Sequence, residues 1–228
     1  GNGTAAYIDT VEEARKVLVE EASSTLFPIA KDVKIQVEFN PAQITEYRLI
    51  GYESRLLARE DFNNDRVDAG DIGAGHTVTA LYEVVLTDNV AGRRIEPLRY
   101  ATTAEEQPAD PAAATAVTPQ SAEAPPRDEL AFIKLRYKQP EETVSRLISR
   151  AVTADDIRPA DTLSDDMRFA AAVAGFGQLL GHDQYLDPSF DLDAVIELAT
   201  DAKGRDEFGQ RAEFVQLVRQ AKTAQDMR

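Results

Sequence analysis

The chain has 228 residues, of which 43% are hydrophobic, and it carries a formal net charge of −15 at pH 7. This length suits one or two domains of roughly 150 residues, and the hydrophobic content supplies a core, which argues against general disorder. The absence of cysteine excludes disulfides, thiolate metal sites and a cysteine nucleophile, and it leaves the cellular compartment open. Strong acidity argues against nucleic acid as a main partner. No apolar run predicts a membrane span and no leader segment opens the sequence.

The first 30 residues predict the end of one structural unit. Residues 7–9 are typical of a short strand, and Thr10 followed by Glu13 forms a capping box that predicts a helix running to Pro28. Because a single short strand cannot form a sheet, we expect this unit to be the tail of a preceding domain. Its apolar stripe must then be covered, by docking on the β domain or on a second copy in a homodimer. The stripe consists of Val17, Leu18, Ala22 and Leu26.

Residues 31–100 switch to a period of two, which indicates strands over 33–39, 44–52 and 78–86. In the first strand the alternation predicts that Val33, Ile35, Val37 and Phe39 share a buried face. In the third it predicts that Val78, Ala80, Tyr82, Val84 and Leu86 do so. The polar stretch 59–75 separates the last two strands, and residues 98–100 form a short strand at best. The connections are too short for helical crossovers, so the strands are expected to be antiparallel.

Residues 101–128 are rich in proline and alanine and contain no aromatic residue, which predicts a disordered loop. Strand character returns at 131–137, and residues 144–152 then complete a hairpin or form a helix, since their spacing fits both. Strands on both sides of the loop place it inside one antiparallel β domain over 31–153, rather than at a boundary.

From residue 154 to 228 the pattern predicts a layer of about three helices. They are expected near 164–180, from Pro188 to Lys203, and from Asp206 onward. The first is rich in small residues, among them Gly175 and Gly177, which predicts close packing against a neighbour because glycine otherwise destabilises a helix. The fold class is therefore α+β: an antiparallel β-sandwich-like domain, a C-terminal helical layer and an N-terminal helix from a preceding domain.

An acidic cluster over residues 60–71 resembles a calcium loop in part, because alternating carboxylate and amide side chains can direct oxygens to one centre. The pattern then departs from such a loop: Arg66 stands where glycine is needed, and Ile72 stands at the acidic twelfth position. A turn held by Asp and Asn side chains is the favoured interpretation, and calcium is the alternative. The candidate ligands are Asp61, Asn63, Asp65, Asp68 and Asp71.

No catalytic or cofactor-binding residue is predicted elsewhere. The glycines at 70, 73 and 75 lack phosphate-loop spacing, and His76 and His182 fall in different predicted layers, without zinc-site spacing. There is no G-x-S-x-G elbow, and carboxylate pairs occur by chance in so acidic a chain. A hydrolase without a recognisable local motif stays open as a third reading.

Two groups of residues carry a family resemblance. Residues 7–9 (YID) and 12–17 (EEARKV) resemble the last strand and last helix of a von Willebrand factor A domain. Residues 33–41 (VKIQVEFNP), 47–53 (YRLIGYE) and 68–83 (DAGDIGAGHTVTALYE) are similar to the region that follows it in bacterial YfbK-like proteins, a C-terminal domain with no assigned function. The run over 68–83 is the most specific part.

The resemblance implies an A domain upstream, together with its metal-ion-dependent adhesion site. The D-x-S-x-S loop of that site does not occur in this sequence, so no metal ligand is carried over. It also implies a parent at the cell envelope, periplasmic or extracellular, although a cytoplasmic location stays open. The leading hypothesis is a non-catalytic accessory domain that positions the A domain in protein–protein interaction. The alternative is a calcium-responsive binding module.

Overall fold

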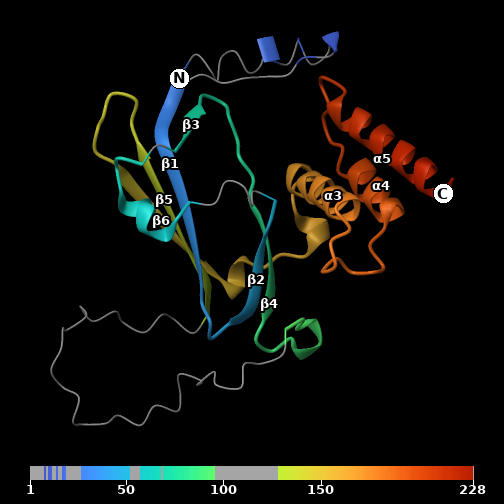
Figure 1. The fold of residues 1–228 in the computed structure, drawn as a ribbon, viewed down its shortest axis with the longest axis horizontal. Helices are drawn as coiled ribbons and strands as arrows, with labels where there is room; N and C mark the ends of the chain where they lie inside the picture. The colour runs from blue at the N-terminus through green and yellow to red at the C-terminus, as the bar shows by residue number, and fades with distance from the viewer. Residues whose placement is uncertain are drawn as a thin grey trace.

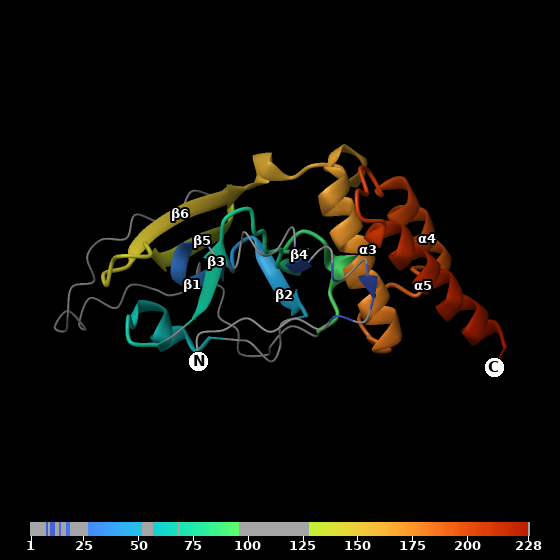
Figure 2. The same cartoon turned by 90° about the horizontal axis from the view of Figure 1, so that it is seen from above.

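The computed structural model describes residues 8, 10, 11, 14, 17, 18, 27–51, 57–67, 69–95 and 128–227. These residues form a four-stranded antiparallel sheet, a two-stranded antiparallel sheet and three α-helices (Figure 1). The two-stranded sheet lies between the four-stranded sheet and the helices in both views (Figures 1 and 2). The α+β class with a C-terminal helical layer is confirmed.

The four-stranded sheet has the order β3 (Gly70–Gly73), β1 (Pro28–Phe39), β5 (Glu129–Lys138) and β6 (Arg146–Thr153). Residues 144–152 could have been strand or helix, and pairing with β5 makes most of them strand. The first strand begins at Pro28, earlier than expected and inside the unit predicted for residues 1–30. A proline suits this place, because the first residue of a strand can do without a backbone N–H.

The two-stranded sheet pairs β2 (Ile44–Ile50) with β4 (Leu81–Leu86). A turn after β1, in which Gln43 and Ile44 donate backbone hydrogen bonds to Asn40 O, leads into β2. Two sequence expectations are corrected here. Residues 70–73 are strand β3 paired with β1, whereas the glycines there predicted a connection, and residues 77–80 are not strand. Strand β3 is found only through its distant partner β1, so local pattern did not reveal it.

The predicted burial of the strand faces is also corrected. Ile35 is 50% exposed whereas Lys34, on the opposite face, is 3% exposed. In β4, Tyr82 is 37% exposed whereas Val85 is 8% exposed. In β1 the alternation correctly groups the apolar side chains from Val33 to Phe39 on one face. That face is partly open in the described structure, and the segment around the short helix η3 (Arg59–Asn63) contacts the other face of β1 through Lys34.

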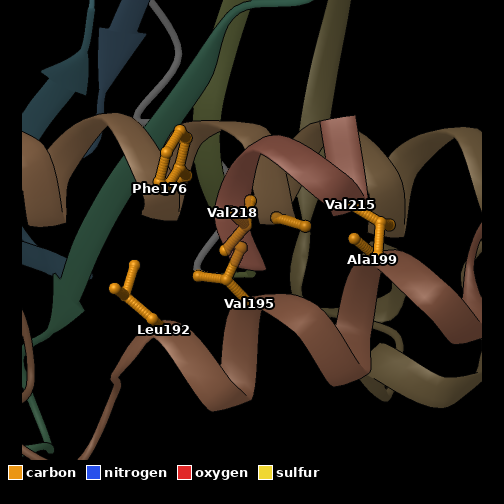
Figure 3. Packing of buried hydrophobic residues seen from close by; sticks show 7 residues of the cluster. Phe176, Leu192, Val195, Ala199, Val215 and Val218 are labelled. Carbon is orange, nitrogen blue, oxygen red and sulfur yellow. The ribbon is translucent and has the colours of Figure 1, made fainter. Parts of the chain in front are cut away.

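The helical layer consists of α3 (Asp165–Leu180), α4 (Leu192–Asp201) and α5 (Gln210–Asp226), close to the predicted spans. The N-cap side chains of Ser164 and Asp191 accept hydrogen bonds from Met167 N and Ala194 N, so that α3 and α4 begin at these residues. Figure 3 shows the side chains of the three helices meeting in one core. Its buried members are Ala172, Phe176, Leu192, Val195, Ala199, Val215 and Val218.

Small residues in α3 have unequal roles. A Cβ at Gly175 would lie 2.5 Å from Phe190 Cε1, so this glycine is required for close packing, as predicted. At Gly177 a Cβ would meet nothing within 4 Å, which corrects the expectation for that position.

Several expectations fall outside the described residues: most of the N-terminal helix, the strand at 98–100 and the loop at 101–127. Of that helix, Val11 and Ala14 are helical, and Ala14 N donates to Thr10 O at 3.0 Å. Within the described part of the chain, none of the helices combines the length and the apolar character needed to cross a membrane.

Candidate functional site

The acidic segment 59–67 is held by lysine side chains from the four-stranded sheet. The buried Lys34 donates from Nζ to Asp61 O at 3.2 Å and to Asn64 O at 2.5 Å, and Lys138 Nζ donates to Asp65 O at 2.8 Å. Backbone carbonyls of this kind are ligands in calcium loops. Here they accept hydrogen bonds from ammonium groups, so the segment is fixed to β1 and β5 by cations of the chain itself.

The side chains predicted as calcium ligands face different partners. Asn63 Oδ1 accepts from Arg136 Nη1 at 2.9 Å, and Asp65 Oδ1 accepts from Ser145 Oγ at 2.7 Å. The hydrogen bond from Ser145 lowers the pKa of Asp65 below its ordinary value. Asp71 lies on β3, where its Oδ1 accepts from Asp32 N at 3.2 Å.

Asp68 lies outside the described residues. Among the residues that are described, no group of three or more acidic, histidine or cysteine side chains could hold a metal ion. The calcium hypothesis therefore stays a prediction. The hydrogen bonds of the segment are those of a turn held against the four-stranded sheet.

A polar cluster that sequence reasoning missed joins the two-stranded sheet to the helical layer. Arg48 on β2 donates from Nε to Glu83 on β4 at 2.7 Å and forms an ion pair with Asp183, which follows α3. The guanidinium groups of Arg48 and Arg94 lie 5.3 and 5.7 Å from the ring centroid of Tyr185. The pairing of Arg48 with Glu83 opposite it needs only the register of the sheet, but Asp183 is 135 residues away.

Electrostatics in this cluster favour a structural joint. The hydrogen bond from Arg48, with further bonds from Gln178 and the Tyr185 backbone, lowers the pKa of Asp183 to about 2. Arg94 Nη2 also lies 2.6 Å from Glu83 Oε1, so that two cations face two carboxylates. A carboxylate stabilised in this way stays ionised near neutral pH and is a poor general acid or base there.

A hollow of about 860 Å³ lies between the two sheets, and we call it the inter-sheet groove. It is lined by residues 33–39 of β1, by Tyr47 and Leu49 of β2 and by Tyr82 of β4, together with residues in or next to η3, β3 and β4, so that its walls carry both apolar and polar side chains. Phe39 contacts Tyr47 and Tyr82, with ring centroids 4.4 and 5.4 Å apart. Around it, Ile35 is 50% and Tyr47 63% exposed. Exposed apolar side chains that gather in a groove with polar neighbours are typical of interaction sites.

The predicted N-terminal stripe is described only in part. Val17 is half-buried and Leu18 is 67% exposed, whereas Ala22 and Leu26 lie outside the described residues. Val11, which lies upstream in the same predicted helix, is 79% exposed. Within this structure Leu18 is thus not covered by the β domain.

The fold defines an α+β domain built from two antiparallel sheets and a helical layer. The sequence profile of the family described as "Uncharacterized protein YfbK, C-terminal" matches residues 24–224. Over 227 residues the chain is 44% identical to the "Uncharacterized protein YfbK" of Escherichia coli (strain K12), and the match covers 100% of this chain and 36% of that protein. The chain therefore belongs to the YfbK C-terminal family, and it spans about a third of the length of this relative. No solved structure matches it.

Proposed function

We propose that this chain is a non-catalytic accessory domain that positions a preceding von Willebrand factor A domain for protein–protein interaction at the bacterial cell envelope. The observation that carries the proposal is the inter-sheet groove. Both of its walls carry exposed side chains with apolar surface, with Ile35 of β1 at 50% and Tyr47 of β2 at 63%. Covering such surface stabilises an interface by about 25 cal/mol for each Å² of apolar area removed from water.

The occupant that we assign to the groove is the surface of the preceding A domain. Three observations support this choice. The family match starts at residue 24, so the predicted strand and most of the predicted helix fall outside the matched region. β1 begins at Pro28, only a few residues later, and lines the groove. The relative has about two-thirds of its length outside the match, which is room for another domain.

The exposed apolar residues of the N-terminal segment support the same proposal. Leu18 is 67% and Val11 79% exposed, and the last helix of an A domain would pack such residues against its own sheet. A second copy of the chain is the competing cover, and a concentration-dependent dimer of the isolated chain would indicate it.

The non-catalytic part of the proposal is supported by the pairing of ionisable groups. Asp65 and Asp183 accept hydrogen bonds from neighbouring side chains, and their pKa values are lowered. A carboxylate acting as general acid near pH 7 needs a raised pKa instead. Among the described contacts none favours the calcium-responsive module or the hydrolase over the accessory domain.

The test uses the full-length protein that carries this region. Ile35→Lys places a charge on the wall of the groove, and Ile157→Lys is the matched control, since Ile157 is 56% exposed but does not line the groove. We expect Ile35→Lys to increase protease cleavage between the A domain and β1 and to enlarge the radius of gyration, while the control leaves both unchanged. Equal behaviour of the two variants would contradict the proposed contact.

A further inference from the structure

The outer edge of the four-stranded sheet has the features of a strand-binding site. Strand β6 lies at the end of the strand order, and among the described residues no strand pairs with its second side (Figure 2). Residues 146–150 of this strand are all exposed. Leu147 is 56% and Ile148 is 55% exposed, although they point to opposite faces. Unpaired N–H and C=O groups along such an edge are a template for another strand.

The register shows what surrounds this edge on one face of the sheet. Ile35, Leu135 and Ile148 lie opposite one another on β1, β5 and β6, which gives an aliphatic row across three strands. On the same face of β6, Arg146 and Arg150 flank Ile148 on either side. Their side chains are 50% and 73% exposed. The edge therefore presents exposed arginine and aliphatic side chains on a chain whose net charge is −15.

We propose that the β6 edge binds an extended acidic segment of another protein by strand addition. The backbone of the added strand pairs with the free edge of β6, and its side chains give specificity. An aliphatic residue lies opposite Ile148 and extends the aliphatic row. Carboxylates four residues apart lie opposite Arg146 and Arg150, because directly opposed residues of paired strands share a face and opposite charges stabilise the pair.

Charge favours this partner over a second copy of the chain. Two copies of β6 pairing antiparallel about Ile148 would place Arg146 of one copy against Arg150 of the other. Like charges opposite one another destabilise a strand pair. A register shifted by two residues in either direction, with the pair centred on Leu147 or Ser149, places an arginine opposite Ile148. An acidic partner meets neither cost.

The arginines already have partners within the chain, and these leave room for exchange. Arg146 pairs with Glu142 at 2.6 Å and Arg150 pairs with Asp156 at 2.9 Å. Both are exposed ion pairs, which contribute little to stability and compete with water. Carboxylates delivered by an added strand can therefore replace or join them. Arginines on a sheet edge also disfavour nonspecific pairing with other strands. They do not disfavour a strand that carries acidic side chains.

The probe is a fluorescently labelled peptide, Thr-Glu-Val-Ile-Thr-Glu-Val, whose two glutamates are four residues apart. Its affinity for the 228-residue chain is measured by anisotropy and compared with that of a peptide carrying lysine at both glutamate positions. We expect the glutamate peptide to bind about tenfold more tightly than the lysine peptide. A second measurement uses the double variant Arg146→Glu with Arg150→Glu, for which the preference should reverse.

The control variant is Arg205→Glu, which alters a side chain 88% exposed in the helical layer and should change neither affinity. Circular dichroism of each variant checks that it is folded. A reversed preference between the two peptides shows that they bind at the folded β6 edge. The proposal is overturned if the two peptides bind the wild-type chain equally or not at all. It is also overturned if sedimentation shows a dimer that Ile148→Lys dissociates, because the edge would then be occupied by a second copy.

Discussion

The burial of Lys34 explains how an acidic segment can be held without a metal ion. A lysine side chain that is 3% exposed must have its ammonium group hydrogen-bonded, and Asp61 O and Asn64 O accept from it. The positive charge of the Lys34 ammonium group interacts favourably with these carbonyl oxygens and with the carboxylates of the acidic segment. The same residue therefore explains why β1 is buried at one position of the face that its alternation predicted to be polar.

Replacing this lysine should destabilise the protein. In Lys34→Met the two carbonyls lose their donor, so we expect the free energy of unfolding to fall by about 2 kcal/mol. Urea denaturation measures the loss, and amide exchange over residues 59–67 should accelerate. Lys203→Met, at an exposed lysine of the helical layer, should stay within about 0.5 kcal/mol of the wild type. A Lys34→Met protein as stable as the control would show that the segment is held by other contacts.

The ion pair between Arg48 and Asp183 gives the joint between sheet and helices a pH dependence. Because the pKa of Asp183 is lowered to about 2 in the folded state, from about 3.9 in an unfolded chain, its contribution is complete above about pH 5. That contribution is lost as the pH falls toward 2.

The variant Asp183→Asn tests this joint. At pH 7 we expect its free energy of unfolding to be about 1 kcal/mol lower than that of the wild type. This figure allows for screening of the ion pair by solvent. The difference should shrink as the pH is lowered from 5 to 3 in urea denaturation. Asp161→Asn, at an exposed position, provides the comparison and should show no such trend. A difference that is independent of pH would mean that the charge of Asp183 is not what stabilises the joint.

At the scale of the elements, α3 contains two glycines that should respond in opposite ways to alanine. At Gly175 the new Cβ would overlap the ring of Phe190, at 2.5 Å from Cε1, and overpacking of this kind costs about 1–3 kcal/mol. At Gly177 the space is open, so the higher helix propensity of alanine should stabilise the fold by up to about 1 kcal/mol. Thermal unfolding of the two variants tests both signs. A stabilised Gly175→Ala protein would show that Phe190 can move aside.

Local pattern predicts the elements of this fold well where the signal is local. Ser164 before an amphipathic run marks the start of α3, and the α+β class follows from the change of period between strands and helices. Residues 144–152 stayed ambiguous because Val144, Leu147 and Ile148 fit both periods, and only pairing with β5 selects the strand. Strand β3 was missed for the same reason, since its partner β1 lies about 40 residues earlier.

The candidate site was less accessible to sequence reasoning. Alternation predicts which side chains of a strand share a face, but it does not predict whether that face is covered. Ile35 was grouped correctly, yet its burial depends on how the two sheets approach each other. The link between Arg48 and Asp183 spans 135 residues and leaves no local trace. Tertiary contacts of this kind are decided by packing, which a single sequence does not display.

At the scale of the whole molecule, the closed core of the helical layer contrasts with the open surface between the two sheets. The three-helix core is closed, with Val195 and Val218 fully buried, whereas the groove between the sheets is exposed along both walls. This division leaves the β region as the part whose surface a neighbouring domain would complete.

Hydrogen–deuterium exchange tests this account most directly, by comparing the isolated 228-residue chain with the full-length protein that carries an A domain upstream. The account predicts slower exchange in the full-length protein over residues 33–39, 44–50 and 81–86, which line the groove or lie beside it. Exchange in α4, whose buried residues belong to the closed core, should be unchanged. Equal exchange rates along the three strands in both proteins would contradict a domain seated in the groove.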